Sequence, residues 1–122
     1  MKDRQSVARE GEALATRYLI DAGWQILERN YHYGRAGEID IIARDDEYIV
    51  FVEVKTRRSR SCGAPEYAIT RAKQQQLLRI ARGWLWLQGC NETPCRFDVI
   101  TISIMFGRPE IHHIRNAFTS TS

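Results

Sequence analysis

Two carboxylates and a lysine occur in a part of the sequence that otherwise has the composition of buried strands. Residues 37–57 read GEIDIIARDDEYIVFVEVKTR, and two apolar runs flank the polar cluster at residues 44–47. Asp40, Glu53 and Lys55 stand inside these runs, where a sheet would normally carry Val or Ile. Burying ionisable groups is costly, so the stability of a fold does not by itself favour these residues.

A hairpin would bring the three side chains together. Alternate residues of a strand share a face, so Glu53 and Lys55 project from the same side. If residues 46–47 form the turn, Asp40 lies directly opposite Glu53, with Cβ atoms roughly 4.5–5.5 Å apart. If residues 45–46 form it, Asp40 lies diagonal to Glu53 at roughly 7–8 Å, still on the same face. Either register gathers the three groups at one end of the sheet.

The chemistry that suits two close carboxylates is binding of a divalent cation. Such carboxylates repel each other unless a positive charge lies between them. Mg²⁺ prefers one or two carboxylates together with waters and substrate phosphate oxygens, so Asp40, Glu53 and the Val54 carbonyl predict a site for Mg²⁺ or Mn²⁺. In the alternative, Lys55 neutralises both acids in a purely structural ion-pair cluster.

The elements that must position these residues follow from hydrophobic periodicity. A helix is expected at residues 6–22, ended by Gly23, and a second at residues 70–88, ended by Gly89. Strands are expected at residues 24–33, 38–44, 48–55, 96–106 and 111–114. This order predicts an α/β domain with one mixed sheet flanked by helices, and a central position for residues 50–54. The domain is expected to span residues 1–117, and residues 118–122 to form a disordered tail.

Two helix residues are further candidates for the site. Glu12 borders the apolar stripe of the first helix, so it either reaches the carboxylate pair or is solvated at the edge of the stripe. Lys73 projects with the apolar residues in the first turn of the second helix. It either approaches a phosphate at the site or marks a frayed helix start.

Basic residues are concentrated in one part of the chain. Residues 55–91 contain eight basic residues and one acid, a net charge of +7, so the rest carries −4 of the total +3. This asymmetry predicts a surface that binds a polyanion, with phosphate contacts that position the ligand without reading its sequence. The alternatives are a solvated helix face and a surface for an acidic protein. The residues expected to contact nucleic acid are Arg57, Arg58, Arg60, Arg71 and Lys73, with Arg79 and Arg82 as an extension.

Composition excludes several other classes of protein. The chain of 122 residues has no apolar run near the roughly 20 residues that a membrane helix needs, and its charged start is unlike a signal peptide. Three cysteines without metal-ligand spacing predict reduced thiols with no role in the chemistry. A cytoplasmic protein is therefore expected.

Several short motifs together resemble a known family. They are the Gly-Glu pair at residues 11–12, Tyr-Leu at 18–19, GEIDIIA at 37–43, FVEVKTR at 51–57 and RFDVI at 96–100. In order and spacing they resemble the YraN-type family of predicted bacterial endonucleases. That family is similar to the archaeal Holliday-junction resolvases within the PD-(D/E)xK nuclease superfamily.

The resemblance implies a restriction-endonuclease-like fold and assigns roles by position. Asp40 matches the aspartate of the nuclease motif, Glu53 its second acid and Lys55 its lysine. Glu12 matches the first-helix glutamate that the resolvases use near the metal. The leading proline of the motif is absent, because Ile39 precedes Asp40.

The function implied is Mg²⁺- or Mn²⁺-dependent endonuclease activity on DNA, selective for branched or single-stranded structure. The alternative is a catalytically silent nucleic-acid-binding module of the same fold that acts with a partner. Resolvases work as two-fold dimers, so a homodimer is a further expectation, with Trp86 and the last strand as candidate contacts.

Overall fold

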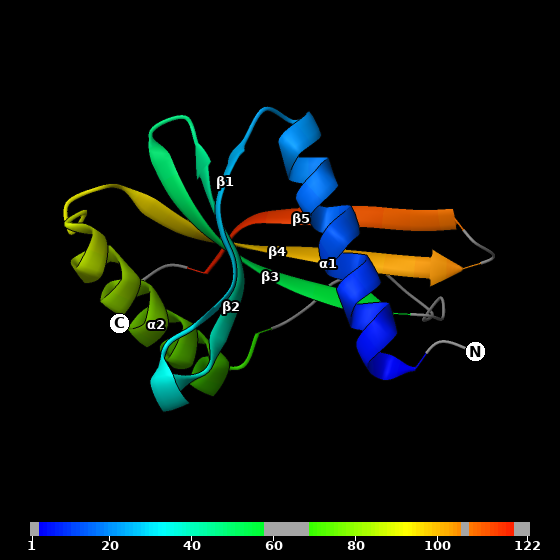
Figure 1. The fold of residues 1–122 in the computed structure, drawn as a ribbon, viewed down its shortest axis with the longest axis horizontal. Helices are drawn as coiled ribbons and strands as arrows, with labels where there is room; N and C mark the ends of the chain where they lie inside the picture. Colours follow the sequence, from blue (N-terminus) through cyan, green and yellow to red (C-terminus); the bar gives the residue numbers. More distant parts are fainter. Residues whose placement is uncertain (1–2, 58–68, 106–107, 119–122) are drawn as a thin grey trace.

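Five strands form a single sheet with a helix on each face (Figure 1). The computed structural model describes residues 3–57, 69–105 and 108–118. The elements in chain order are α1 (Arg4–Asp21), β1 (Gln25–His32), the 3₁₀ turn η1 (Gly34–Ala36), β2 (Glu38–Asp45), β3 (Tyr48–Arg57), α2 (Arg71–Gln88), β4 (Cys95–Met105) and β5 (Arg108–Phe118). The strands lie in the order β1-β2-β3-β4-β5. Only β3 and β4 run parallel among these neighbours, and α2 connects them.

The predicted fold class is confirmed. Ile49 and Phe51 of β3 pack under α2, while Val50 and Val52 of the same strand pack under α1, so β3 is covered on both faces. β3 is also the middle strand of the sheet, as its apolar composition predicted. A mixed sheet flanked by helices in this way is consistent with a restriction-endonuclease-like fold.

Helix ends lie close to their predicted positions. Thr70 caps the start of α2 by accepting a hydrogen bond from the backbone N–H of Lys73 at 3.1 Å. Gly89 ends the helix with φ +70°, a left-handed conformation that glycine adopts without strain. Neither α1 nor α2 combines the length and the apolar composition required to traverse a lipid bilayer.

The last strand is longer than predicted. β5 spans eleven residues and pairs with β4 from Met105 to Phe97, rather than covering only residues 111–114. It is an edge strand with polar side chains and Pro109 near its start, features that edge strands tolerate and that obscure the strand pattern in the sequence. Phe118 belongs to β5 and stacks on Phe97, with ring centroids 4.6 Å apart. Residues 119–122 lie outside the described part of the chain.

The hairpin of β2 and β3 has the first of the two predicted registers. Asp45 pairs with Tyr48, so residues 46–47 form the turn, and Asp46 adopts φ +58° there. The ladder continues to the pair Ile41 and Val52. Asp40 and Glu53 are the next residues on their strands, immediately beyond this last pair.

A glycine allows α1 to approach β3 closely. A Cβ atom at Gly11 would lie 1.8 Å from Oγ1 of Thr56, so no other residue fits without movement of the helix or the strand. Gly11 precedes Glu12, whose side chain must reach the sheet from α1. The contact between Gly11 and Thr56 therefore sets the position of Glu12.

Substitution Gly11→Ala tests this close approach. We expect it to destabilise the protein by about 1–3 kcal/mol, the usual cost of overpacking. The loss should be largely recovered in the double variant Gly11→Ala/Thr56→Gly, which removes the atoms that the new Cβ would meet. Urea unfolding of the two single variants and the double variant measures the coupling. Additive losses would contradict the proposed contact.

A second set of charged residues is buried between β4 and β5. The side chain of Asp98 is fully buried, and it accepts hydrogen bonds from Nε of Arg96 at 3.1 Å and from the Asn116 backbone at 3.0 Å. Nε2 of His113 lies 2.7 Å from its other oxygen, and Nδ1 of His113 lies 3.0 Å from the Tyr18 hydroxyl on α1. Burial alone would raise the pKa of Asp98, but these partners hold that pKa below its ordinary value.

The lowered pKa predicts a pH-dependent contribution to stability. The stabilisation by Asp98 should be complete well above pH 4 and should disappear as the pH falls toward the lowered pKa of the folded state. We expect Asp98→Asn to cost about 3 kcal/mol at pH 7 and progressively less in acid. Denaturant unfolding at pH 7 and pH 4 measures this difference, with the exposed Glu110→Gln as control. A cost independent of pH would contradict the assignment.

Candidate metal centre

β2 and β3 separate at Asp40. Beyond the last backbone pair, the N–H of Val54 donates to Oδ2 of Asp40 at 2.8 Å, so a side chain takes up this donor of β3. The carboxylate is half-buried at the point where the strands part. This bond fixes the orientation of Asp40 and leaves its second oxygen available to a ligand.

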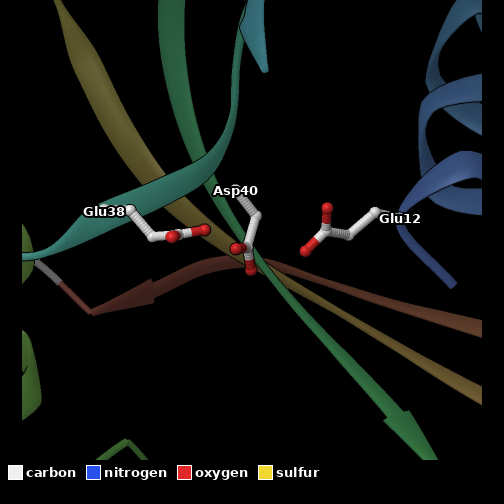
Figure 2. Close-up of side chains that lie close together, drawn as sticks. All are labelled: Glu12, Glu38 and Asp40. Carbon is white, nitrogen blue, oxygen red and sulfur yellow. The ribbon is translucent and has the colours of Figure 1, made fainter. Parts of the chain in front are cut away.

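Three carboxylates converge at this point (Figure 2). Glu12 reaches in from α1, while Glu38 and Asp40 come from the same side of β2, and one oxygen of each lies within 4.8 Å of one oxygen of the other two. Figure 2 shows Asp40 between the two glutamates. We call these three residues the acidic cluster.

Each residue of the acidic cluster is oriented by a hydrogen bond to one of its oxygens. Oε1 of Glu12 accepts from Nδ2 of Asn30 at 2.8 Å, and Oε1 of Glu38 lies 2.9 Å from Nε2 of His32. Asn30 has φ +52° in β1, a conformation that asparagine tolerates better than most residues. Carboxylates that hold metal ions are commonly supported by such bonds, which fix the ligands before the ion binds.

Glu53 lies next to the acidic cluster and has a cationic partner of its own. Its side chain is only 9% exposed, and Oε2 lies 3.8 Å from Nζ of Lys73 in the first turn of α2. Lys73 thus points toward the sheet, as one of its two predicted alternatives required. Lys55 lies two residues further along β3, where its side chain is exposed.

The negative charges raise the pKa of Asp40 to about 7, far above its ordinary value of 3.8. Burial is the largest cause, followed by the charge of Glu53. The charges of Glu12 and Glu38 act in the same direction, and the N–H of Val54 opposes them. Asp40 therefore feels all three neighbouring acids, and a cation bound among them would remove this repulsion.

The donor set suits a hard divalent cation. Neighbouring ligands of octahedral Mg²⁺ at roughly 2.0–2.1 Å lie about 3 Å apart, so the oxygens of the acidic cluster, within 4.8 Å of one another, need only a small contraction. The three residues offer oxygen atoms alone, which Mg²⁺ and Mn²⁺ prefer to nitrogen or sulfur. The cluster fits the ion that the sequence predicted, with Glu38 as an additional ligand.

Two contributors were missed by the sequence reasoning. Glu38 stands two residues before Asp40 on the same strand, a spacing that places both on one face and could have indicated it. Asn30 gave no such signal, because its left-handed backbone conformation in β1 is not evident from the sequence. Glu12, Asp40 and Glu53, in contrast, were predicted and do lie close together.

The predicted nucleic-acid contacts are only partly described. Arg57 ends β3 and is half-buried, while Arg71 begins α2 and is exposed. Arg58 and Arg60 fall in residues 58–68, outside the described part of the chain.

The fold and the acidic cluster define a class: an α/β domain with carboxylates gathered where two central strands part. Within this class, the chain belongs to the uncharacterised protein family UPF0102, whose model matches residues 11–102. The matched range includes all four acids around Asp40. Three relatives, each named UPF0102 protein, cover nearly the whole chain. The Geotalea uraniireducens protein is 45% identical over 95% of this chain and 91% of its own length. The Geobacter metallireducens protein is 48% identical over 93% of both chains. The Rhodococcus jostii protein is 43% identical over 97% of this chain and 100% of its own.

The raised pKa of Asp40 predicts that its charge destabilises the metal-free protein. Its contribution to stability should be complete below about pH 4 and lost as the pH rises through about 7. We expect Asp40→Asn, which keeps an oxygen for the Val54 N–H, to be more stable than the native protein at pH 8, by up to about 4 kcal/mol. The advantage should shrink toward pH 5.

Denaturant unfolding in the presence of a chelator at pH 5 and pH 8 measures this effect. Asp21→Asn is the matched control, because Asp21 is an exposed acid on α1 whose partner is Arg17. If Asp40→Asn is less stable than the native protein at pH 8, the repulsion has been misjudged.

Proposed function

We propose that this protein is a divalent-metal-dependent endonuclease that hydrolyses phosphodiester bonds in DNA, selecting branched or single-stranded structure rather than base sequence. The observation that supports it most is the acidic cluster, with Asp40 at its centre and Glu53 beside it. The motif resemblance to PD-(D/E)xK nucleases and to the archaeal resolvases gives the same assignment. Cytoplasmic location and a homodimer stay predictions of the sequence.

The carboxylates would hold the ion. Asp40, Glu12 and Glu38 each present an oxygen while a chain donor holds the other, and Glu53 adds charge from the neighbouring strand. A bound Mg²⁺ or Mn²⁺ would supply an activated water and stabilise charge on the scissile phosphate. A surplus of acids over nearby cations supports a site for a cation rather than a closed ion-pair cluster.

The lysines would act on the phosphate and the attacking water. Lys55 projects from the same side of β3 as Glu53, so its ammonium group can orient or deprotonate the water and offset negative charge at the phosphate. Lys73, 3.8 Å from Glu53, would share that carboxylate with the ion or move to a phosphate oxygen. Arg57, Arg58, Arg60 and Arg71 would contact the flanking backbone.

A second candidate is a nucleic-acid-binding module that cuts nothing and acts with a partner. The ion pair of Glu53 with Lys73 favours it, because that pair neutralises the second acid of the nuclease motif without a metal. Both candidates predict binding to DNA, and only the first predicts hydrolysis that depends on the carboxylates.

Cleavage assays separate the two candidates. Labelled branched, flapped, single-stranded and blunt duplex DNAs are incubated with the protein and either Mg²⁺ or Mn²⁺. We expect cleavage of the branched or single-stranded substrates, and a loss of at least about 100-fold in Asp40→Asn and Glu53→Gln. Glu38→Gln should lose about ten-fold or more, and all three variants should still bind DNA.

The control is Glu110→Gln, an exposed acid on β5 whose substitution should leave the rate unchanged. No cleavage of any substrate by the native protein with either metal, alongside measurable DNA binding, would overturn the nuclease and support the binding module. Cleavage that survives both Asp40→Asn and Glu53→Gln would show that the reaction uses other residues.

A further inference from the structure

The outer face of α2 carries arginines in line with an exposed tryptophan. Five side chains lie within about 80° of one another around the helix axis at 100° per residue. All five are exposed: Arg71, Gln75, Arg79, Arg82 and Trp86. We call these five residues the α2 stripe.

The α2 stripe is positively charged and lacks nearby acids. α2 itself contains no Asp or Glu. Within residues 3–57, 69–105 and 108–118, no ion pair joins Arg71, Arg79 or Arg82 to a carboxylate. A face that serves solubility alone would not need three arginines without acids, and it would not place a large aromatic ring among them.

The indole of Trp86 distinguishes this stripe from an ordinary basic helix face. Trp86 is 70% exposed, whereas Trp24 and Trp84 are 6% and 4% exposed and belong to the core. Arginine groups that follow a phosphate backbone, combined with an aromatic ring on which a base stacks, are the means by which proteins hold single strands. A duplex offers the phosphates but keeps its bases stacked inside.

The α2 stripe begins next to the candidate metal centre. Lys73, in the first turn of α2, lies 3.8 Å from Glu53, and Arg71 precedes it by two residues. From Arg71 to Trp86 the helix rises about 22 Å, the length of about six nucleotides at 3.4 Å each. A strand that passes the acidic cluster could therefore continue along α2 to Trp86.

We propose that the α2 stripe binds an unpaired nucleic-acid strand, with its arginines on the phosphates and the indole of Trp86 stacked on a base. As a statement about the substrate, this rests on the proposed function: the DNA that the enzyme cuts has a single-stranded segment next to the cut. As a statement about binding, it stands whether or not the protein cuts.

The distribution of the three tryptophans provides a direct readout. Trp24 and Trp84 are buried, so a change in fluorescence on addition of an oligonucleotide comes chiefly from Trp86. The protein is titrated, with a chelator present to prevent cleavage, with a 12-nucleotide single strand, a duplex bearing a single-stranded tail, and a blunt duplex. Anisotropy of labelled DNA gives the affinity independently of the tryptophan signal.

We expect quenching with the single strand and the tailed duplex and little with the blunt duplex. The two substrates with unpaired bases should bind about ten-fold or more tightly than the blunt one. Trp86→Ala should remove this preference and leave affinity for the blunt duplex unchanged. The double variant Arg79→Gln/Arg82→Gln should lower the slope of log K against log salt by about 1.4 for the single strand.

Leu87→Ala is the matched control, because Leu87 is the next residue on α2, is 61% exposed and has no aromatic ring. It should leave both quenching and preference intact. Equal losses in Trp86→Ala and Leu87→Ala, or a self-association that Trp86→Ala abolishes, would overturn the proposal in favour of an apolar contact with another protein or a second copy. Equal affinity for all three DNAs would also overturn it.

Failure of this proposal and failure of the nuclease are separable. Quenching and preference without cleavage in Mg²⁺ or Mn²⁺ leave the α2 stripe assigned and remove the enzyme. Cleavage with no contribution from Trp86 removes only the α2 stripe.

Discussion

Repulsion among four carboxylates at the parting of β2 and β3 is the constraint on which the rest of this structure depends. Asp40 lies at the centre, and burial together with the charges of Glu53, Glu12 and Glu38 raises its pKa to about 7. Local backbone features hold this unfavourable group together, including the glycine contact that seats α1 and the left-handed residue in β1. Unfavourable local structure that its surroundings maintain is typical of functional sites.

The two buried acidic positions of the molecule differ in a way that separates chemistry from architecture. Asp98 is fully buried and has an arginine, a histidine and a backbone N–H around it, so its negative charge is compensated and its pKa is lowered. Asp40 has one backbone N–H and three acids, so its charge is uncompensated and its pKa is raised. The first arrangement joins β4, β5 and α1, while the second leaves room for a cation.

The sequence carried much of this account because the hairpin constrains its own geometry. The turn at residues 46–47 and alternation along two short strands suffice to place Asp40 beside Glu53, and helical periodicity puts Glu12 at the border of α1. Contacts between elements distant in sequence were out of reach. Whether Lys73 meets Glu53 depends on how α2 docks, and the hydrogen bond from Asn30 to Glu12 depends on an irregularity in β1. The polar edge strand β5 was underestimated for a similar reason, since its pairing with β4 rather than its own pattern defines it.

Calorimetric titration of the metal-free protein with Mn²⁺ at pH 7, in two buffers of different ionisation enthalpy, tests the central claim most directly. With a pKa of about 7, Asp40 is half protonated at that pH, and an ion bound by its carboxylate must displace the proton. The account predicts binding with release of about half a proton per ion, lost in Asp40→Asn. Absence of binding heat in both buffers, or binding that Asp40→Asn leaves unchanged, would contradict it.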